Sequence, residues 1–185
     1  MMMNLPTTEE VEKLTLRAIA VYAARCARRA TPLLRGLLDD EIIELPLRMA
    51  EKLGSERHLD ISDTAAAPLA AAQIAAAMDS LNTRQAKLAA LSLTRVADVV
   101  SMVLNAATNP TREEWTRGQR MRAARSAVKT PVHVVHALGK AAASIAIEAA
   151  RSDYEVLLNE FKEHQNVVLG EPIELSEEWW KKNRK

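Results

Sequence analysis

The chain has 185 residues, of which 48% are hydrophobic, yet 32 of these are alanines and only six are aromatic. A β-sandwich or barrel needs more β-branched and aromatic side chains than this, and a net charge of +1 argues against both a disordered chain and a general polyanion binder. Alanine is the strongest helix former, and the length suits one domain. We therefore expect an all-α fold, a single compact alanine-rich bundle of six or seven helices.

A capping box opens the first expected helix. Thr7 lies three residues before Glu10, so that each side chain can hydrogen-bond a free amide at the helix start. Apolar residues follow at helical spacing, namely Val11, Leu14, Ala18, Val21 and Ala24. We expect Pro32 to kink or end this helix and Gly36 to close the segment.

Prolines set the expected bounds of the next two helices. Pro46 suits the first turn of a short second helix, which we expect to stop at Gly54. The third helix is expected to begin near Ser62 to Thr64 and to end near Met78, and we favour the later start because Pro68 is acceptable in a first turn only.

Two further caps mark the fourth and fifth helices. Asn82 or Thr83 is expected to cap the fourth, and Thr111 with Glu114 forms a second capping box before a fifth helix that ends near Lys129. The buried face of the fourth helix is expected at Leu88, Leu91, Val96, Val99, Val103 and Leu104.

The last third is expected to hold two helices and a tail. Pro131 starts or kinks the sixth helix, and a final helix runs from about Asp153 to His164. The expected core face of the sixth comprises Val132, Val135, Leu138, Ala142, Ile145 and Ala149. We thus divide the chain into a helical domain, 1–165, and an extended C-terminal tail, 166–185, packed on the domain or projecting from it.

Charge is unevenly distributed along the chain. Residues 111–151 carry eight bases and three acids, whereas residues 152–178 carry eight acids and one base. The basic helix at 112–129 could bind nucleic-acid phosphates or an acidic protein. Alternatively, the two segments neutralise each other within the fold, and we favour this interpretation because adjacent blocks of opposite sign tend to compensate.

Histidine and cysteine offer two candidate sites. His133 and His136 share a helix face and could ligate a metal, but no third ligand lies nearby, so packing is the commoner explanation. Cys26, among arginines, is either an activated thiolate or a small buried hydrophobe, and the second is more usual. No catalytic motif accompanies them, so we predict a protein that is not an enzyme and needs no cofactor or metal.

Two adjacent tryptophans near the end form the most unusual local feature. Trp179 and Trp180 precede a run of basic residues and could anchor a partner or a membrane surface, or one ring could fold back over an alanine-rich groove. The first residues lack the pattern of a signal peptide. The alanine run at 65–77 is the nearest approach to a membrane span, yet Pro68 and Gln73 interrupt it. We expect a cytoplasmic protein without membrane contact.

Two stretches carry a resemblance to a known family. Residues 17–34, RAIAVYAARCARRATPLL, contain Cys26, Arg29 and the Pro-Leu pair of an A-A-x-C-A-x-R helix. Residues 122–142, RAARSAVKTPVHVVHALGKAA, match an R-A-A-x-x-A-V-x-T-x-H-x-x-x-H-x-L-G-A-A pattern that includes His136 and Gly139. Both are similar to the fifth numbered family of bacterial polymorphic-toxin immunity proteins. In this register the first histidine of the pattern falls on Val132, so His133 is one place out of step.

The resemblance implies a small all-α cytoplasmic protein that binds and neutralises a cognate toxin by occlusion. We accordingly predict a non-catalytic interaction protein, with a nucleic-acid-binding module using 112–129 as the alternative. A metal-dependent enzyme built on His133, His136 and His164 is a third hypothesis. The predicted partner-binding residues are Trp115, Arg122, Arg125, Trp179 and Trp180. The oligomeric state is not set by the sequence.

Overall fold

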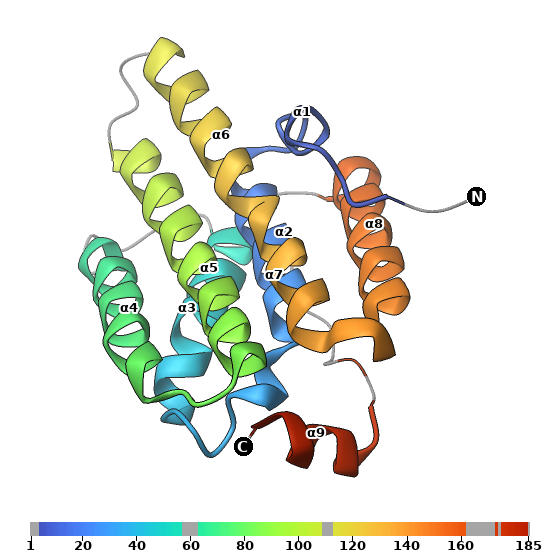
Figure 1. Ribbon diagram of the computed structural model, residues 1–185. Coiled ribbons are helices and arrows are strands. Elements are labelled where there is room, and N and C mark those ends of the chain that lie inside the picture. Colours follow the sequence, from blue (N-terminus) through green and yellow to red (C-terminus); the bar gives the residue numbers. More distant parts are fainter. Residues whose placement is uncertain (1–3, 57–62, 109–112, 162–172, 174, 185) are drawn as a thin grey trace.

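A computed structural model describes residues 4–56, 63–108, 113–161, 173 and 175–184 of the chain. Within these ranges the protein is all-α and contains no β-strand, as the composition predicts (Figure 1). The helices form one bundle, in which the apolar side chains of nearly every helix join a common core.

The N-terminal segment forms two helices where we expected one. The predicted capping box is confirmed at α1 (Thr8–Val11), because the Thr7 amide donates to Glu10 Oε2 at 2.8 Å and the Glu10 amide donates to Thr7 Oγ1 at 3.3 Å. The chain then turns and begins again at α2 (Leu16–Arg28), where Thr15 Oγ1 accepts from the amide of Ala18. A second N-cap that we had not predicted therefore separates the two.

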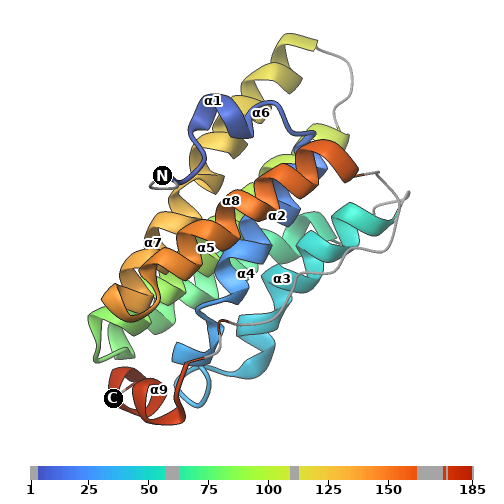
Figure 2. The ribbon, with the colours of Figure 1, turned by 90° about the vertical axis from the view of Figure 1, so that its right-hand side faces the viewer.

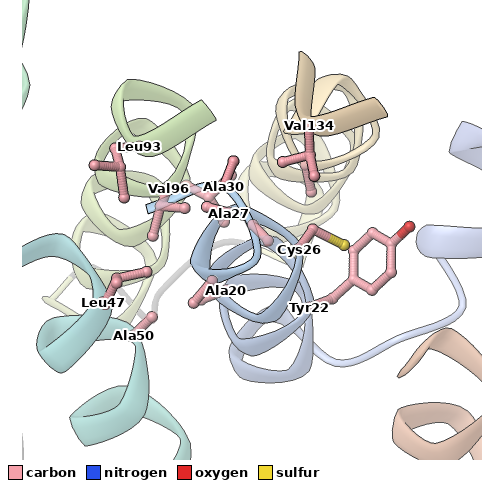
Figure 3. Packing of buried hydrophobic residues seen from close by; sticks show 14 of the residues in the cluster. Ala20, Tyr22, Cys26, Ala27, Ala30, Leu47, Ala50, Leu93, Val96 and Val134 are labelled. Atoms are coloured by element: carbon pink, nitrogen blue, oxygen red, sulfur yellow. The ribbon is translucent and has the colours of Figure 1, made fainter. Parts of the chain in front are cut away.

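Helix α2 lies at the centre of the bundle and packs against α3, α5, α6, α7 and α8 (Figure 2). Its middle is buried on every side: Ala18, Ile19, Ala20, Val21, Tyr22, Ala23, Ala24, Cys26 and Ala27. Alanines make such burial possible because a helix with small side chains lets several neighbours approach it closely. Figure 3 shows Ala20 and Ala27 of this helix beside Leu47 of α3 and Val96 of α5.

The prolines lie inside the second and third predicted helices and not in their first turns, so the predicted start near Pro46 is wrong, whereas the start predicted near Ser62 to Thr64 is confirmed. Helix α3 spans Asp40–Ser55 with Pro46 in its interior, and α4 spans Asp63–Ala77 with Pro68 in its interior. In α3 the Asp39 side chain caps the earlier start by accepting from the Glu41 amide at 2.9 Å. A proline inside a helix costs about 3 kcal/mol, so packing must offset it, and Pro46 is itself buried.

Helix α5 (Arg84–Thr108) is the long inner helix that contacts α2, α3, α4, α6 and α7. Thr83 is its cap, since its Oγ1 accepts from the Ala86 amide at 3.1 Å. Among the described residues, Arg84–Ala107 is the one segment whose length and composition would suit a membrane span, rather than the alanine run at 65–77. Just over half of it is buried within the bundle, and the core helix of a soluble protein can have the same length and apolar composition.

The predicted sixth helix is two helices. After α6 (Glu113–Ala127) come α7 (Lys129–Leu138) and α8 (Ala143–Glu160), separated by Gly139, whose φ of +63° ends α7. The expected core face is therefore partly wrong: Val132 is 37% and Ile145 49% exposed. The buried positions are Thr130, Pro131, Val134, Ala137 and Leu138 in α7 and Ala146, Ala150, Tyr154 and Leu157 in α8. Leu158, next to Leu157 on α8, is 43% exposed.

The C-terminal segment ends in a helix. Residues Glu177–Arg184 form α9, so the expectation of an extended tail is wrong over this stretch. The hydroxyl of Ser176 caps it by accepting from the Trp179 amide at 3.2 Å. Short 3-10 turns complete the connections: η1 (Thr31–Leu33), η2 (Met78–Ser80) and η3 (Gly139–Ala141). The predicted capping residue Thr111 lies outside the described residues.

Candidate protein-binding surface

The outer side of α6 carries a basic surface. Arg117, Gly118, Met121, Arg122 and Arg125 are all exposed and follow one another around the same arc of the helix. In the last two turns of α6 the opposite arc carries small buried residues: Ala123, Ala124, Ser126 and Ala127. We call the five exposed residues the α6 arginine face. Alanines on the inner side hold the helix against the bundle and leave the long arginines on the outer side.

None of these arginines forms an ion pair or a side-chain hydrogen bond among the described residues. The C-terminal acid that is best placed to neutralise arginines, Asp153 on α8, instead pairs with Arg25 at 3.4 Å and Arg29 at 2.5 Å. The compensation that we favoured from the sequence, between residues 111–151 and 152–178, is therefore not seen among the described residues, where Asp153 joins α8 to α2 instead. Glu163 and the acids that follow it up to residue 172 lie outside the described ranges.

The predicted tryptophan anchors do not form one surface. Trp180 is 8% exposed and joins the core, while Trp179 is half-buried and meets it edge to face, with ring centroids 5.0 Å apart. Helix α9 contacts η1 and α5, and Thr83 Oγ1 donates to the carbonyl of Asn183 at 3.0 Å. These rings therefore fix α9 to the bundle. Trp115 lies in the first turn of α6, and its side chain is outside the described part of the structure.

Three residues of the family-like motifs, Cys26, Arg29 and Gly139, have roles in the packing and connections of the helices. Cys26 is fully buried, and burial raises the pKa of its thiol to about 12, although Arg29 opposes this shift. The small-hydrophobe interpretation is thereby confirmed over the activated thiolate; Figure 3 shows the Cys26 sulfur beside the ring of Tyr22. Arg29 pairs with Asp153, and Gly139 supplies the positive φ between α7 and α8.

His133 and His136 lie on α7 beside the inner helix α5. His136 is exposed, whereas His133 is half-buried and its Nδ1 is a buried atom without a hydrogen-bond partner. Burial lowers the pKa of His133, and the positive charges of Arg95, His136 and Lys129 lower it further. Among the residues that the structure describes, no three histidine, cysteine or carboxylate side chains are grouped as metal ligands. His164 lies outside that set.

Two residues in these surroundings were missed from the sequence. Arg95 of α5 helps to lower the pKa of His133 on α7 through its positive charge, and Asp153 pairs with two arginines of α2. The spacing of Arg95 and Asp98 was a readable signal of a helical ion pair, and the two are 3.3 Å apart. The pairing of Asp153 spans more than 120 residues, and no local pattern signals it.

A comparison of the chain with protein families, with curated proteins and with solved structures finds no match.

Proposed function

We propose that the chain is a non-catalytic interaction protein that binds an acidic protein partner through the α6 arginine face. One observation carries the proposal: Arg117, Arg122 and Arg125 are exposed and have no ion-pair partner among the described residues, whereas the arginines of α2 and α8 that face acids are paired within the fold.

The chemistry of the face suits a protein partner. A guanidinium presents a planar fork that binds a carboxylate through two parallel hydrogen bonds. The arginines surround Met121, which is 36% exposed, and arginine and methionine are both enriched at interfaces. Gly118 lets a partner approach the helix backbone closely, since it has no side chain and even an added Cβ would meet no atom within 4 Å. A stable complex must bury about 1,200–2,000 Å² in total, so neighbouring residues would complete the interface.

The concrete form that we propose is toxin immunity in the bacterial cytoplasm. The support is the similarity of residues 17–34 and 122–142 to the immunity family, since the second stretch includes Arg122 and Arg125 on the proposed face. An immunity protein of this kind acts by covering its toxin, which requires a surface and no catalytic group. Electrostatic attraction between a basic face and an acidic toxin would also speed their encounter.

The test uses the purified chain and the purified product of the neighbouring gene. We expect a stoichiometric complex by size-exclusion chromatography and calorimetry. The double variant Arg122→Glu/Arg125→Glu is expected to raise the dissociation constant by about 100-fold, because like charges across an interface repel. Arg35→Glu is the control, since Arg35 is also exposed but lies away from α6, just after η1. Absence of a complex with every adjacent gene product, or equal weakening by both variants, would contradict the proposal.

The same arginines are the feature on which nucleic-acid binding would depend. Three phosphate contacts would give a slope of about −2.7 in log K against log salt for duplex DNA. Fluorescence anisotropy with labelled DNA and RNA at several salt concentrations measures this slope. Tight binding that persists at physiological salt and is lost in Arg122→Glu/Arg125→Glu would show that the face binds nucleic acid and would contradict the proposal of a protein partner.

A further inference from the structure

The outer side of α8 carries a surface of opposite charge to the α6 arginine face. Helix α8 lies at the edge of the bundle and packs against α2 and α7 (Figure 1). Its inner arc is buried at Ala146, Ala150, Tyr154 and Leu157. Six exposed residues form the outer arc at helical spacing: Ile145, Glu148, Ser152, Glu155, Val156 and Asn159. We call these six residues the α8 acidic face.

The two glutamates of this face keep their charge at the surface. Neither Glu148 nor Glu155 forms an ion pair among the described residues. Arg151, which lies between them in sequence, directs its guanidinium to the Asn4 carbonyl and to the carboxylate of Glu10 instead. Glu155 raises the pKa of Arg151 through its charge but accepts no hydrogen bond from it within the described ranges. The α8 acidic face therefore retains an excess of negative charge.

The two faces match each other in charge, length and apolar content. Arg117 and Arg125 are about 12 Å apart along the axis of α6, and Glu148 and Glu155 are about 11 Å apart along that of α8. Exposed apolar side chains lie among the charges on both faces, namely Met121 on α6 and Ile145 and Val156 on α8. Opposite charges around apolar contacts are what two surfaces need for specific recognition of each other.

We propose that the α8 acidic face binds the α6 arginine face of a second copy of this chain. Arginines of one copy then pair with Glu148 and Glu155 of the other, and Met121 packs beside Val156. A second copy is the occupant because the chain displays both halves of a complementary pair, and no ion pair joins these halves in the part of one molecule that the structure describes. A contact between two helix faces is smaller than a stable interface, and exposed charges are screened by salt, so the association is weak and decreases with ionic strength.

Self-association would regulate the partner-binding surface, a consequence that rests on the proposed function. A copy whose α6 arginine face is covered by the α8 acidic face of another copy cannot present that face to an acidic partner. Binding of the partner must then release the second copy, because the two compete for the same arginines and their coupling is reciprocal.

Mixing of two charge-reversed variants tests the contact directly. Arg122→Glu/Arg125→Glu gives a chain with two acidic faces, and Glu148→Arg/Glu155→Arg gives one with two basic faces. Sedimentation velocity at low ionic strength is expected to show self-association of the parent chain at about 100 μM. Each variant alone is expected to associate at least about tenfold more weakly. An equimolar mixture of the two is expected to associate again, because every mixed contact joins opposite charges.

A control variant separates this contact from a general effect of net charge. Glu51→Arg/Asp79→Arg reverses two exposed acids on α3 and η2 and is expected to leave self-association unchanged. The proposal is overturned if the parent chain stays monomeric at about 1 mM, if the mixture does not associate, or if the control weakens association as much as Glu148→Arg/Glu155→Arg. These outcomes leave the proposed function standing, since Glu148→Arg/Glu155→Arg retains the α6 arginine face for calorimetry with the neighbouring gene product.

Discussion

Two groups of arginines in this protein differ in their exposure and in their ion pairs. On α2, Arg25 and Arg29 lie in the interior of the bundle and converge on Asp153 of α8, with 12–19% of each of the three side chains exposed. On α6, Arg122 and Arg125 point outward and meet no acid among the described residues. The difference teaches that arginine content alone does not mark a binding surface, because half of the candidates are used to join helices.

The contrast divides the arginines into two groups with different roles. Paired arginines stabilise the fold, and their loss leaves a buried charge without a partner. Unpaired exposed arginines contribute little to the fold and remain available to a partner. The predictions that follow test this division, from the largest expected effect to the smallest.

Removing the shared acid of the α2–α8 network has the largest expected effect. Asp153→Ala leaves Arg25 and Arg29 without their carboxylate in a place that is 12–19% exposed. We expect the free energy of unfolding to fall by about 2–3 kcal/mol, somewhat less than for a fully buried pair. Urea denaturation followed by circular dichroism measures it.

The matched comparison is a more exposed ion pair on the same helix. Arg28 pairs with Glu44 at 2.7 Å, with 24% and 31% of the side chains exposed. Glu44→Gln is expected to cost less than about 1 kcal/mol. Equal losses for the two variants would contradict the claim that the less exposed Asp153 network stabilises the fold more than the Arg28–Glu44 pair does.

The link between α8 and the N-terminus is expected to respond to pH. The pKa of Glu10 lies below its ordinary value of 4.5, chiefly because Arg151 donates to it at 2.7 Å, and also because the Thr7 amide donates to it. A lowered folded-state pKa means that this stability is present above pH 4.5 and is lost as the pH falls through the folded-state value.

Glu10→Gln tests that pH dependence while keeping the capping box, since glutamine can replace glutamate at this position. We expect the variant to lose less than about 1 kcal/mol near neutral pH, because the pair is partly exposed. Below pH 4.5 the difference from the parent chain is expected to shrink. Unfolding curves at a series of pH values measure this, and a difference that stays constant would show that Glu10 contributes through neutral hydrogen bonds alone.

The smallest effect is expected on the α6 arginine face. Arg122→Gln and Arg125→Gln remove exposed side chains that have no described partner. Each is expected to change the free energy of unfolding by less than about 0.5 kcal/mol. Thermal unfolding of both variants measures it, and a loss comparable to that of Asp153→Ala would place these arginines in the fold rather than at a binding surface.

Local chemistry explains what could be predicted from the sequence. The all-α fold follows from alanine content, and the caps at Thr7 and Thr83 follow from short spacings that act within one helical turn. The burial of Cys26 follows from its place among alanines. Each of these features is decided by residues close together in the chain, and each is confirmed.

The errors arise where distant packing outweighs local preference. Pro46 and Pro68 normally end helices, yet packing on other helices carries α3 and α4 through them. Gly139 breaks a helix that the alanines on either side favour. The two sets of arginines look alike in sequence, CARR and RAARS, and only the position of Asp153 more than 120 residues away distinguishes them.

Arginine side-chain NMR of the complex tests the central claim most directly. The Nε–Hε signals of the labelled chain are compared before and after addition of the neighbouring gene product. Our account predicts that the signals of Arg117, Arg122 and Arg125 shift or broaden, while those of Arg25 and Arg29 stay in place. Shifts confined to the two α2 arginines, with the α6 signals unchanged, would contradict it.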